Sequence, residues 1–370
     1  MIILNDTDLE IYRELQDHLD KQPISFPKTE SGVEIRVLRH LFTPEEAQIA
    51  SKLNYLPELP KKIYRRIKEI GLTPEQLEER LDKMYDKGSI SRASIESKKF
   101  YFNAPFIVGM YENQLGHLTK EFLINSKQYL KEKFFEKGYN TTGIPQLRVI
   151  PIDESITAEQ SIATYDGLRN VIENSEGVIG IMECICRQGK DLLGDPCKKS
   201  DLREVCFTFR GAAELQHEKG LARLITKDEA LSILEKVKEE GFVLQPDNSK
   251  RPSYMCCCCG CCCEVLTNQK RFDAPAKLFA TNFYAEVNPE LCIGCGVCEE
   301  QCNMNAVEIE DDTSIINKDR CIGCGACVFT CTQEAISLKK KEEEISPPKN
   351  TGEKIKIIME NKAELARSAK

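Results

Sequence analysis

The chain has 370 residues, 41% of them hydrophobic, which is enough for two or three domains with cores of their own. Its formal net charge of −8 disfavours general affinity for nucleic acid, although a negative net charge is compatible with a local basic patch. The N-terminal sequence does not have the pattern of a signal peptide and no run approaches about 18 apolar residues, so we expect a cytoplasmic protein without a membrane span, whose nineteen cysteines stay reduced.

The first part of the chain has the pattern of three helices and a hairpin. The helices are expected in "TPEEAQIASKL", "LPKKIYRRIKEIG" and "LTPEQLEERLDKMYDKG". Thr43 and Thr73 are suitable N-cap residues with Pro next to them, and Gly71 and Gly88 lie where helices end. The following "SISRASIESKKFYFN" alternates loosely and predicts a hairpin. This order of elements resembles a winged-helix domain.

The charge of the third helix argues against DNA recognition by that domain. In a DNA-binding winged helix this helix would enter the major groove, but here its acidic residues outnumber its basic ones. The preceding helix and the hairpin carry a basic cluster that could contact a nucleic-acid backbone or an acidic protein. Its members are Lys61, Lys62, Arg65, Arg66, Lys68, Arg92, Lys98 and Lys99.

The middle of the chain mixes helices and strands. Apolar spacing predicts an amphipathic helix over 106–137, broken near Gly116. Then "QLRVIPI" predicts a strand, "TAEQSIATYDGLRNVIEN" a helix capped by Thr157, and "GVIGIMECICR" a buried strand. A second unit follows, with strand "LARLI", a helix that begins in a capping box of Thr226 and Glu229 and ends at Gly241, and strand "FVLQP".

The first four cysteines form a candidate metal site. They are Cys184, Cys186, Cys197 and Cys206. On a strand, Cys184 and Cys186 would point to the same face, and four thiols are enough to close a site that Arg187 could neutralise. Buried cysteines acting as small hydrophobic residues are the alternative, but four within 23 residues favour metal ligation, by iron–sulfur before zinc.

The segment "MCCCCGCCCEV" is the densest run of cysteines. It contributes Cys256, Cys257, Cys258, Cys259, Cys261, Cys262 and Cys263. In an extended backbone alternate side chains face opposite ways, so the seven thiols cannot converge on one site, and Gly260 permits a bend. The eleven cysteines named so far could hold two cubane clusters, share one larger cluster, or include a disulfide or redox pair. We expect the two segments to meet in space.

Two repeats near the C-terminus carry the most specific motif. The sequences "CIGCGVCEEQC" and "CIGCGACVFTC" both follow the spacing C-x2-C-x2-C-x3-C. Three thiols on one tight loop can bind three iron corners of a cubane, while glycines let backbone amides approach the sulfurs. Paired C-x2-C units also bind zinc, but zinc sites do not normally need four cysteines per repeat. The glycines are Gly294, Gly296, Gly323 and Gly325.

These repeats resemble the bacterial-type ferredoxin domain with two 4Fe–4S clusters, at the end of a multidomain iron–sulfur protein of anaerobes. The resemblance implies that the fourth cysteine of each repeat ligates the other cluster. One implied ligand set is Cys292, Cys295, Cys298 and Cys331, and the other is Cys321, Cys324, Cys327 and Cys302. A proline usually follows the fourth cysteine in that family, whereas Asn303 and Thr332 stand there in this chain.

The fold class expected is α+β and multidomain. The expected segments are an N-terminal segment (1–30), a winged-helix-like domain (31–104), a connecting helix (105–140), a central α/β cysteine-containing domain (141–264), a linker (265–282), a ferredoxin domain (283–340) and a charged tail (341–370), mobile or partly helical.

Three functions are compatible with these patterns. The first is an electron-transfer protein with two 4Fe–4S clusters and one or two further iron–sulfur clusters, zinc being the alternative, which serves a redox partner protein or an oxidoreductase complex. The second is a low-potential iron–sulfur reductase that acts at the extra centre. The third is a redox- or metal-sensing DNA-binding regulator. The sequence leaves open whether the chain is itself an enzyme.

Overall fold

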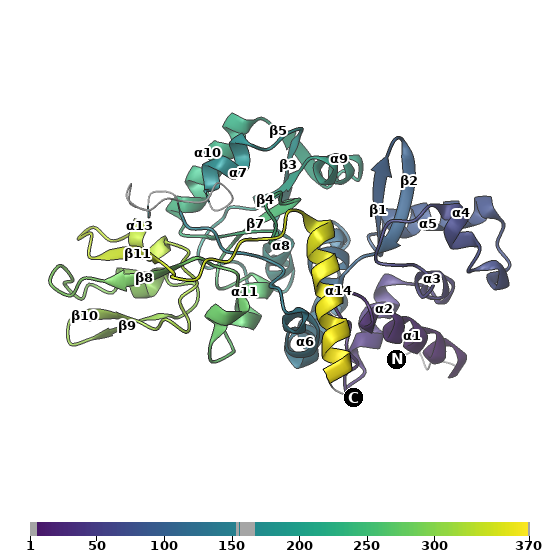
Figure 1. Cartoon of the computed structure of the whole chain (residues 1–370), viewed down its shortest axis with the longest axis horizontal. Helices are drawn as coiled ribbons and strands as arrows, with labels where there is room; N and C mark the ends of the chain where they lie inside the picture. Colours follow the sequence, from purple (N-terminus) through teal and green to yellow (C-terminus); the bar gives the residue numbers. More distant parts are fainter. Residues whose placement is uncertain (1–5, 153–154, 156–166, 369–370) are drawn as a thin grey trace. The chain divides into compact units, whose positions relative to one another are not determined.

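The computed structural model describes residues 6–152, 155 and 167–368 (Figure 1). The chain divides into two compact units, Met1–Gly143 with Ile358–Lys370, and Ile144–Ile357. The central and ferredoxin-like segments, expected as separate domains, both fall within the second unit. Contacts between these two segments therefore belong to a single compact body.

The first unit is mainly helical. Its elements are α1 (Asp6–Asp20), α2 (Val33–Leu41), α3 (Pro44–Ala50), α4 (Pro60–Tyr64), α5 (Pro74–Asp86), β1 (Ile90–Ile95), β2 (Lys98–Asn103) and α6 (Lys120–Tyr129). Thr43 and Thr73 cap α3 and α5 in reciprocal capping boxes with Glu46 and Gln76. Strands β1 and β2 form the expected antiparallel hairpin.

Three details of this unit differ from the sequence-based expectation. Helix α1 was not expected from the sequence, and its buried side chains include Tyr12, Leu15 and Leu19. The expected second helix is shorter, because α4 gives way to a 3-10 turn at Lys68–Ile70. The expected helix over 106–137 has non-helical backbone before residue 111, becomes α6 only at Lys120, and continues as π-type turns over Leu130–Tyr139.

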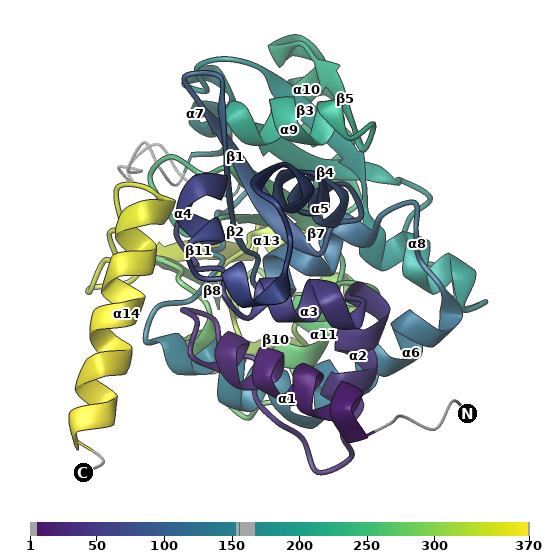
Figure 2. The ribbon, with the colours of Figure 1, turned by 90° about the vertical axis from the view of Figure 1, so that its right-hand side faces the viewer.

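A five-stranded antiparallel sheet forms the centre of the second unit. Its strands are β3 (Ile179–Glu183), β4 (Glu204–Phe209), β5 (Ala222–Ile225), β6 (Val243–Pro246) and β7 (Tyr254–Cys258), in the order β5-β3-β4-β7-β6. The helices are α7 (Leu168–Glu173), α8 (Ile185–Leu192), α9 (Gly211–Glu218), α10 (Lys227–Glu239) and α11 (Glu264–Gln269). Helix α9 packs against β3, β4 and β5 (Figure 2).

The structure corrects the expected strands around the first cysteines. Strand β3 ends at Glu183, so Cys184 is the N-cap of α8 and Cys186 lies in the first turn of that helix. The segment "QLRVIPI" forms only isolated bridges, such as Ile150 with Leu244. The capping residue expected at Thr157 lies outside the described residues, within which α7 occupies the C-terminal part of the expected helical segment and has its N-cap at Gly167.

The ferredoxin-like segment consists of two small antiparallel sheets and two short helices (Figure 1). Its elements are β8 (Phe283–Val287), α12 (Val297–Gln301), β9 (Val307–Glu310), β10 (Thr313–Ile316), α13 (Ala326–Phe329) and β11 (Ile336–Lys340). Strand β8 pairs with β11, and β9 pairs with β10. The charged tail contains a well-formed helix, α14 (Thr351–Ser368).

Candidate metal centres

The glycines of the two repeats allow tight loops around the thiols. Gly294 and Gly323 have a φ of 63°, which side chains rarely adopt. A Cβ atom at Gly294 would lie 2.6 Å from the carbonyl oxygen of Asp312, and one at Gly323 would lie 2.2 Å from that of Phe283. Any side chain would push the first cysteine loop away from the turn between β9 and β10, or the second away from β8.

Two cavities in the ferredoxin-like segment are lined by cysteines of both repeats. One is lined by Cys292, Cys295, Cys298 and Cys331, among other residues. The other is lined by Cys302, Cys321, Cys324 and Cys327. Each cavity thus combines three thiols of one repeat with the fourth thiol of the other, which is the crossed arrangement that the family resemblance implies. We name them cavity I and cavity II.

Backbone amides donate hydrogen bonds to several of these sulfurs. The N–H of Ser314 donates to Cys292 Sγ at 3.4 Å, that of Ala306 to Cys302 Sγ at 3.1 Å, and that of Ala285 to Cys321 Sγ at 3.3 Å. Such bonds stabilise thiolate ligands and tune the potential of a cluster. The sequence had not singled out Ser314, which also lies 3.0 Å from Cys298 Sγ through its hydroxyl oxygen.

The two cavities differ in their access to solvent. Cys295 of cavity I is exposed, and the neighbouring Ile293 is 62% exposed. In cavity II, Cys321 is buried, and the backbone oxygen of Cys324 accepts a hydrogen bond from the N–H of Ile152, which lies outside the ferredoxin-like segment. Cavity I therefore faces outward, while cavity II is covered by the central part of the same unit.

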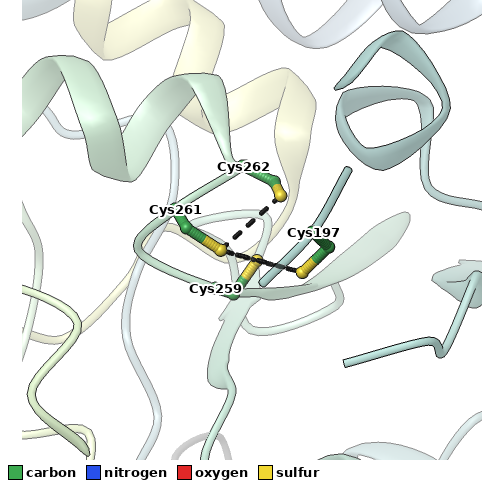
Figure 3. A group of neighbouring side chains, drawn as sticks. All are labelled: Cys197, Cys259, Cys261 and Cys262. Atoms are coloured by element: carbon green, nitrogen blue, oxygen red, sulfur yellow. Dashed lines mark hydrogen bonds between the residues drawn. The ribbon is translucent and has the colours of Figure 1, made fainter. Parts of the chain in front are cut away.

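The structure brings the two central cysteine segments together, as the sequence predicts. Cys197, Cys259, Cys261 and Cys262, here called the four-thiol group, have Sγ atoms that all lie within 4.8 Å of one another. Figure 3 shows their thiols turned toward one another. Cys197 Sγ lies 3.7 Å from both Cys259 Sγ and Cys261 Sγ, and the latter two are 3.4 Å apart.

These distances fit a single tetrahedral metal ion. Metal–sulfur bonds of about 2.3 Å in a tetrahedron place the sulfurs roughly 3.8 Å apart. In a cubane each thiolate binds a different iron, so the sulfurs stand further apart around a central space. The four-thiol group is closed, since four thiolates leave no ligand position open.

The electrostatics of the four-thiol group favour deprotonation of one member. A hydrogen bond from Cys262, opposed by burial and supported by the charge of Arg187, lowers the pKa of Cys259 to about 5. The interaction with Cys259, together with burial, raises the pKa of Cys262. The Cys259 thiolate would provide the first ligand of a metal ion held by this group, and ligation by the other three thiols would require loss of their protons.

Six further cysteines form a second group, here called the six-thiol ring. Side-chain interactions link Cys184 to Cys186 and Cys206, and Cys263 to Cys186 and Cys258. Cys256 interacts with Cys206 and Cys258 and closes the ring. The remaining cysteine, Cys257, lies on the other side of β7 in the hydrophobic core. The alternation expected along this strand thus separates Cys257 from its two neighbours.

Arg187 is a fully buried cation beside both groups. Its side chain stacks on Phe242 with the guanidinium carbon 4.2 Å from the ring centroid, and its Nη1 donates to the backbone oxygen of Cys257 at 3.5 Å. Burial lowers the pKa of Arg187, but the charges of Cys184, Cys259 and Cys258 outweigh it and raise the pKa. Its Nε and Nη2 atoms have no hydrogen-bond partner among the described residues.

Asn303 connects cavity II to the four-thiol group. It follows Cys302, and its Oδ1 accepts a hydrogen bond of 2.8 Å from the N–H of Gly260, which lies between Cys259 and Cys261. Its Nδ2 donates to the backbone oxygen of Gly241 at 2.8 Å. A Cβ atom at Gly260 would lie 2.4 Å from the backbone oxygen of Asn303. Gly260 is therefore needed for this close approach.

Four of the eight residues of the basic cluster in the first unit form ion pairs within that unit. Glu58 forms ion pairs with Lys62 and Arg66, and Asp82 forms ion pairs with Arg92 and Lys99. These pairs reduce the positive field that a phosphate backbone would require.

Comparison with known proteins adds one match. Residues 291–336 match the family model described as a 4Fe-4S dicluster domain. No curated protein and no solved structure matches the chain. This match covers both repeats, and it supports iron–sulfur clusters in the ferredoxin-like segment. Among the helices of the described residues, none has the length and apolar character needed to cross a membrane.

Proposed function

We propose that the chain is a cytoplasmic iron–sulfur electron-transfer protein that connects a redox partner to a metal centre at the four-thiol group. Cys292, Cys295, Cys298 and Cys331 would hold one 4Fe–4S cluster, and Cys302, Cys321, Cys324 and Cys327 would hold the other. Such clusters supply one-electron transfer at low potential. The cysteine lining of cavities I and II and the match to a dicluster domain support this assignment.

The proposed route of electron transfer depends on the contact of Asn303 with Gly260. On one side of this contact, Cys302 belongs to cavity II, and on the other side Cys259 and Cys261 belong to the four-thiol group. Only Asn303 and Gly260 separate these thiols, through one hydrogen bond of 2.8 Å. Electrons would enter near the exposed Cys295, pass inward to cavity II, and reach the four-thiol group through this contact.

The closed ligand set favours a relay over a reductase at the four-thiol group. A catalytic metal keeps a position for substrate, whereas four thiolates fill a tetrahedral ion. Iron in this site would accept and donate an electron, and zinc would not. The half-buried Lys199 places a cation between the two centres, where the charges of Cys324 and Cys259 act on it.

The test is metal and sulfide analysis of the full chain purified without oxygen, with EPR after reduction by dithionite. About eight irons and eight sulfides belong to the ferredoxin-like segment. Cys295→Ser and Cys324→Ser should each abolish the signal of one cluster, while Cys257→Ala, which changes a thiol in the hydrophobic core, should leave both signals intact. Zinc without sulfide in this segment would contradict the proposal.

The metal in the four-thiol group has its own test. Cys261→Ser should remove about one metal ion per chain and no sulfide, since a mononuclear site holds none. Reoxidation of the remaining clusters by an external acceptor should then slow if the site is a relay. If the lost ion is zinc, the group has a structural role and the relay ends at cavity II.

A further inference from the structure

The six-thiol ring is a second candidate site, distinct from the four-thiol group. Its members are Cys184, Cys186, Cys206, Cys256, Cys258 and Cys263. We propose that this ring binds a polynuclear iron–sulfur cluster held by more than four protein thiolates. The proposal rests on the function above only in taking iron and sulfide as what the protein is loaded with.

The sheet and two helix ends converge to build the ring. Cys206 and Cys256 are directly opposite each other on the paired strands β4 and β7. Cys258 is two residues from Cys256 on β7, so both project from the same face of the sheet. Cys184 is the N-cap residue of α8 and Cys263 that of α11, so these two thiols come from helix N-termini and not from the sheet. Separate elements thus aim their thiols at one place.

The number of thiols requires more than one metal ion. A single tetrahedral ion takes four thiolates. Among the described residues, the four thiols of the neighbouring group all gather within 4.8 Å, whereas the six ring thiols are linked in sequence by pairwise side-chain interactions and do not form one such compact group. Six thiolates exceed the ligand number of one tetrahedral ion, so binding through all of them needs at least two metal ions.

The surroundings of the ring suit an anionic cluster. Cys184, Cys258 and Cys263 are buried, so thiolates there would lack hydration unless metal ions or cations balanced them. Arg187 supplies a fully buried positive charge next to Cys184 and Cys258. Its Nε and Nη2 atoms, unpartnered among the described residues, are donors that sulfide or thiolate sulfur can satisfy.

Two polar donors already point at one member of the ring. The N–H of Leu266 donates to Cys263 Sγ at 3.5 Å, and Nε2 of the fully buried Gln245 donates to the same sulfur at 3.9 Å. Donors of this kind stabilise a metal-bound thiolate. The bond from Leu266 also caps α11, so Gln245 is the donor that helix capping does not explain.

The experiment compares metal and sulfide content among variants of the full chain, loaded with iron and sulfide without oxygen. Cys256→Ser and Cys206→Ser should each lose about two or more irons per chain together with sulfide. Cys257→Ala is the matched control, because it alters the adjacent residue on the other face of the same strand and should keep the full wild-type content. Cys261→Ser should lose about one metal ion and no sulfide.

Each outcome decides the proposal. Retention of wild-type iron by both ring variants, loss of about one ion only, or loss of zinc without sulfide would overturn it. Disulfides among the six cysteines in the anaerobic protein, detected by mass spectrometry, would also overturn it. The EPR signals of the ferredoxin-like segment serve as a folding control in every variant. Absence of those signals in the wild type would count against the proposed function and not against the ring.

Discussion

Replacing Asn303 with alanine removes the hydrogen bonds that tie the ferredoxin-like segment to Gly260 of the cysteine loop and to Gly241 just after α10. In the native protein the Asn303 amide accepts from the N–H of Gly260 and donates to the oxygen of Gly241, both at 2.8 Å. Asn303 is buried, so alanine leaves the N–H of Gly260 without a partner, whereas the oxygen of Gly241 still accepts a hydrogen bond from Lys199 Nζ at 3.4 Å. One unsatisfied buried group destabilises this contact by about 1–3 kcal/mol.

Amide hydrogen exchange measures that loss directly. Because each 1.4 kcal/mol corresponds to a factor of ten, the N–H of Gly260 should exchange roughly 5 to 150 times faster in the variant. Metal content should not change, since Asn303 provides no thiolate. The relay proposed above predicts in addition a slower transfer of electrons to the four-thiol group.

Thr332→Ala is the matched control for this variant. Thr332 follows the fourth cysteine of the second repeat as Asn303 follows that of the first, but it is exposed. Its replacement should leave exchange at Gly260 unchanged. If Asn303→Ala also exchanged at the wild-type rate, the contact would not hold the two segments together and the reasoning would fail.

Three other changes test interactions within each of the two units. Gly323→Ala should prevent assembly of the cavity II cluster, because its Cβ would lie 2.2 Å from a backbone oxygen; loss of about four irons and retention of the cavity I signal would be the readout. Lys354→Ala should destabilise the second unit by about 3–5 kcal/mol, because it leaves the fully buried Asp247 carboxylate without its cation. In calorimetry, a Lys354→Met/Asp247→Asn double variant should recover much of that loss of stability. Burial raises the pKa of Glu58, but hydrogen bonds from Arg66 and a lysine outweigh it and lower the pKa to about 2. Because the folded pKa lies below the usual value, the Glu58 carboxylate contributes up to about 3 kcal/mol to the free energy of unfolding above pH 5, and this contribution is lost as the pH falls toward 2. Glu58→Gln should therefore make the free energy of unfolding depend less on pH between pH 5 and pH 2.

Local chemistry explains which elements could be predicted. Thr43 and Thr73 predict the start of their helices, because each side chain accepts a hydrogen bond from a backbone N–H within four residues of it. The expected helix over 106–137 failed because its apolar residues pack by tertiary contacts while the backbone around Gly109 is not helical. The strand expected at Cys184 failed for a similar reason, since periodicity does not mark where a buried strand gives way to a helix.

The sequence by itself determined the ferredoxin-like repeats, because their ligands, glycines and spacing all lie within short loops. It also determined that the seven clustered cysteines must separate, since the two faces of a strand alternate. Only the tertiary structure decided how the eleven central cysteines divide into a four-thiol group, a six-thiol ring and Cys257. That division depends on which strands pair, on the register of Cys206 with Cys256, and on where Asn303 contacts Gly260. Such long-range contacts depend on the packing of the whole unit and leave no local pattern in the chain.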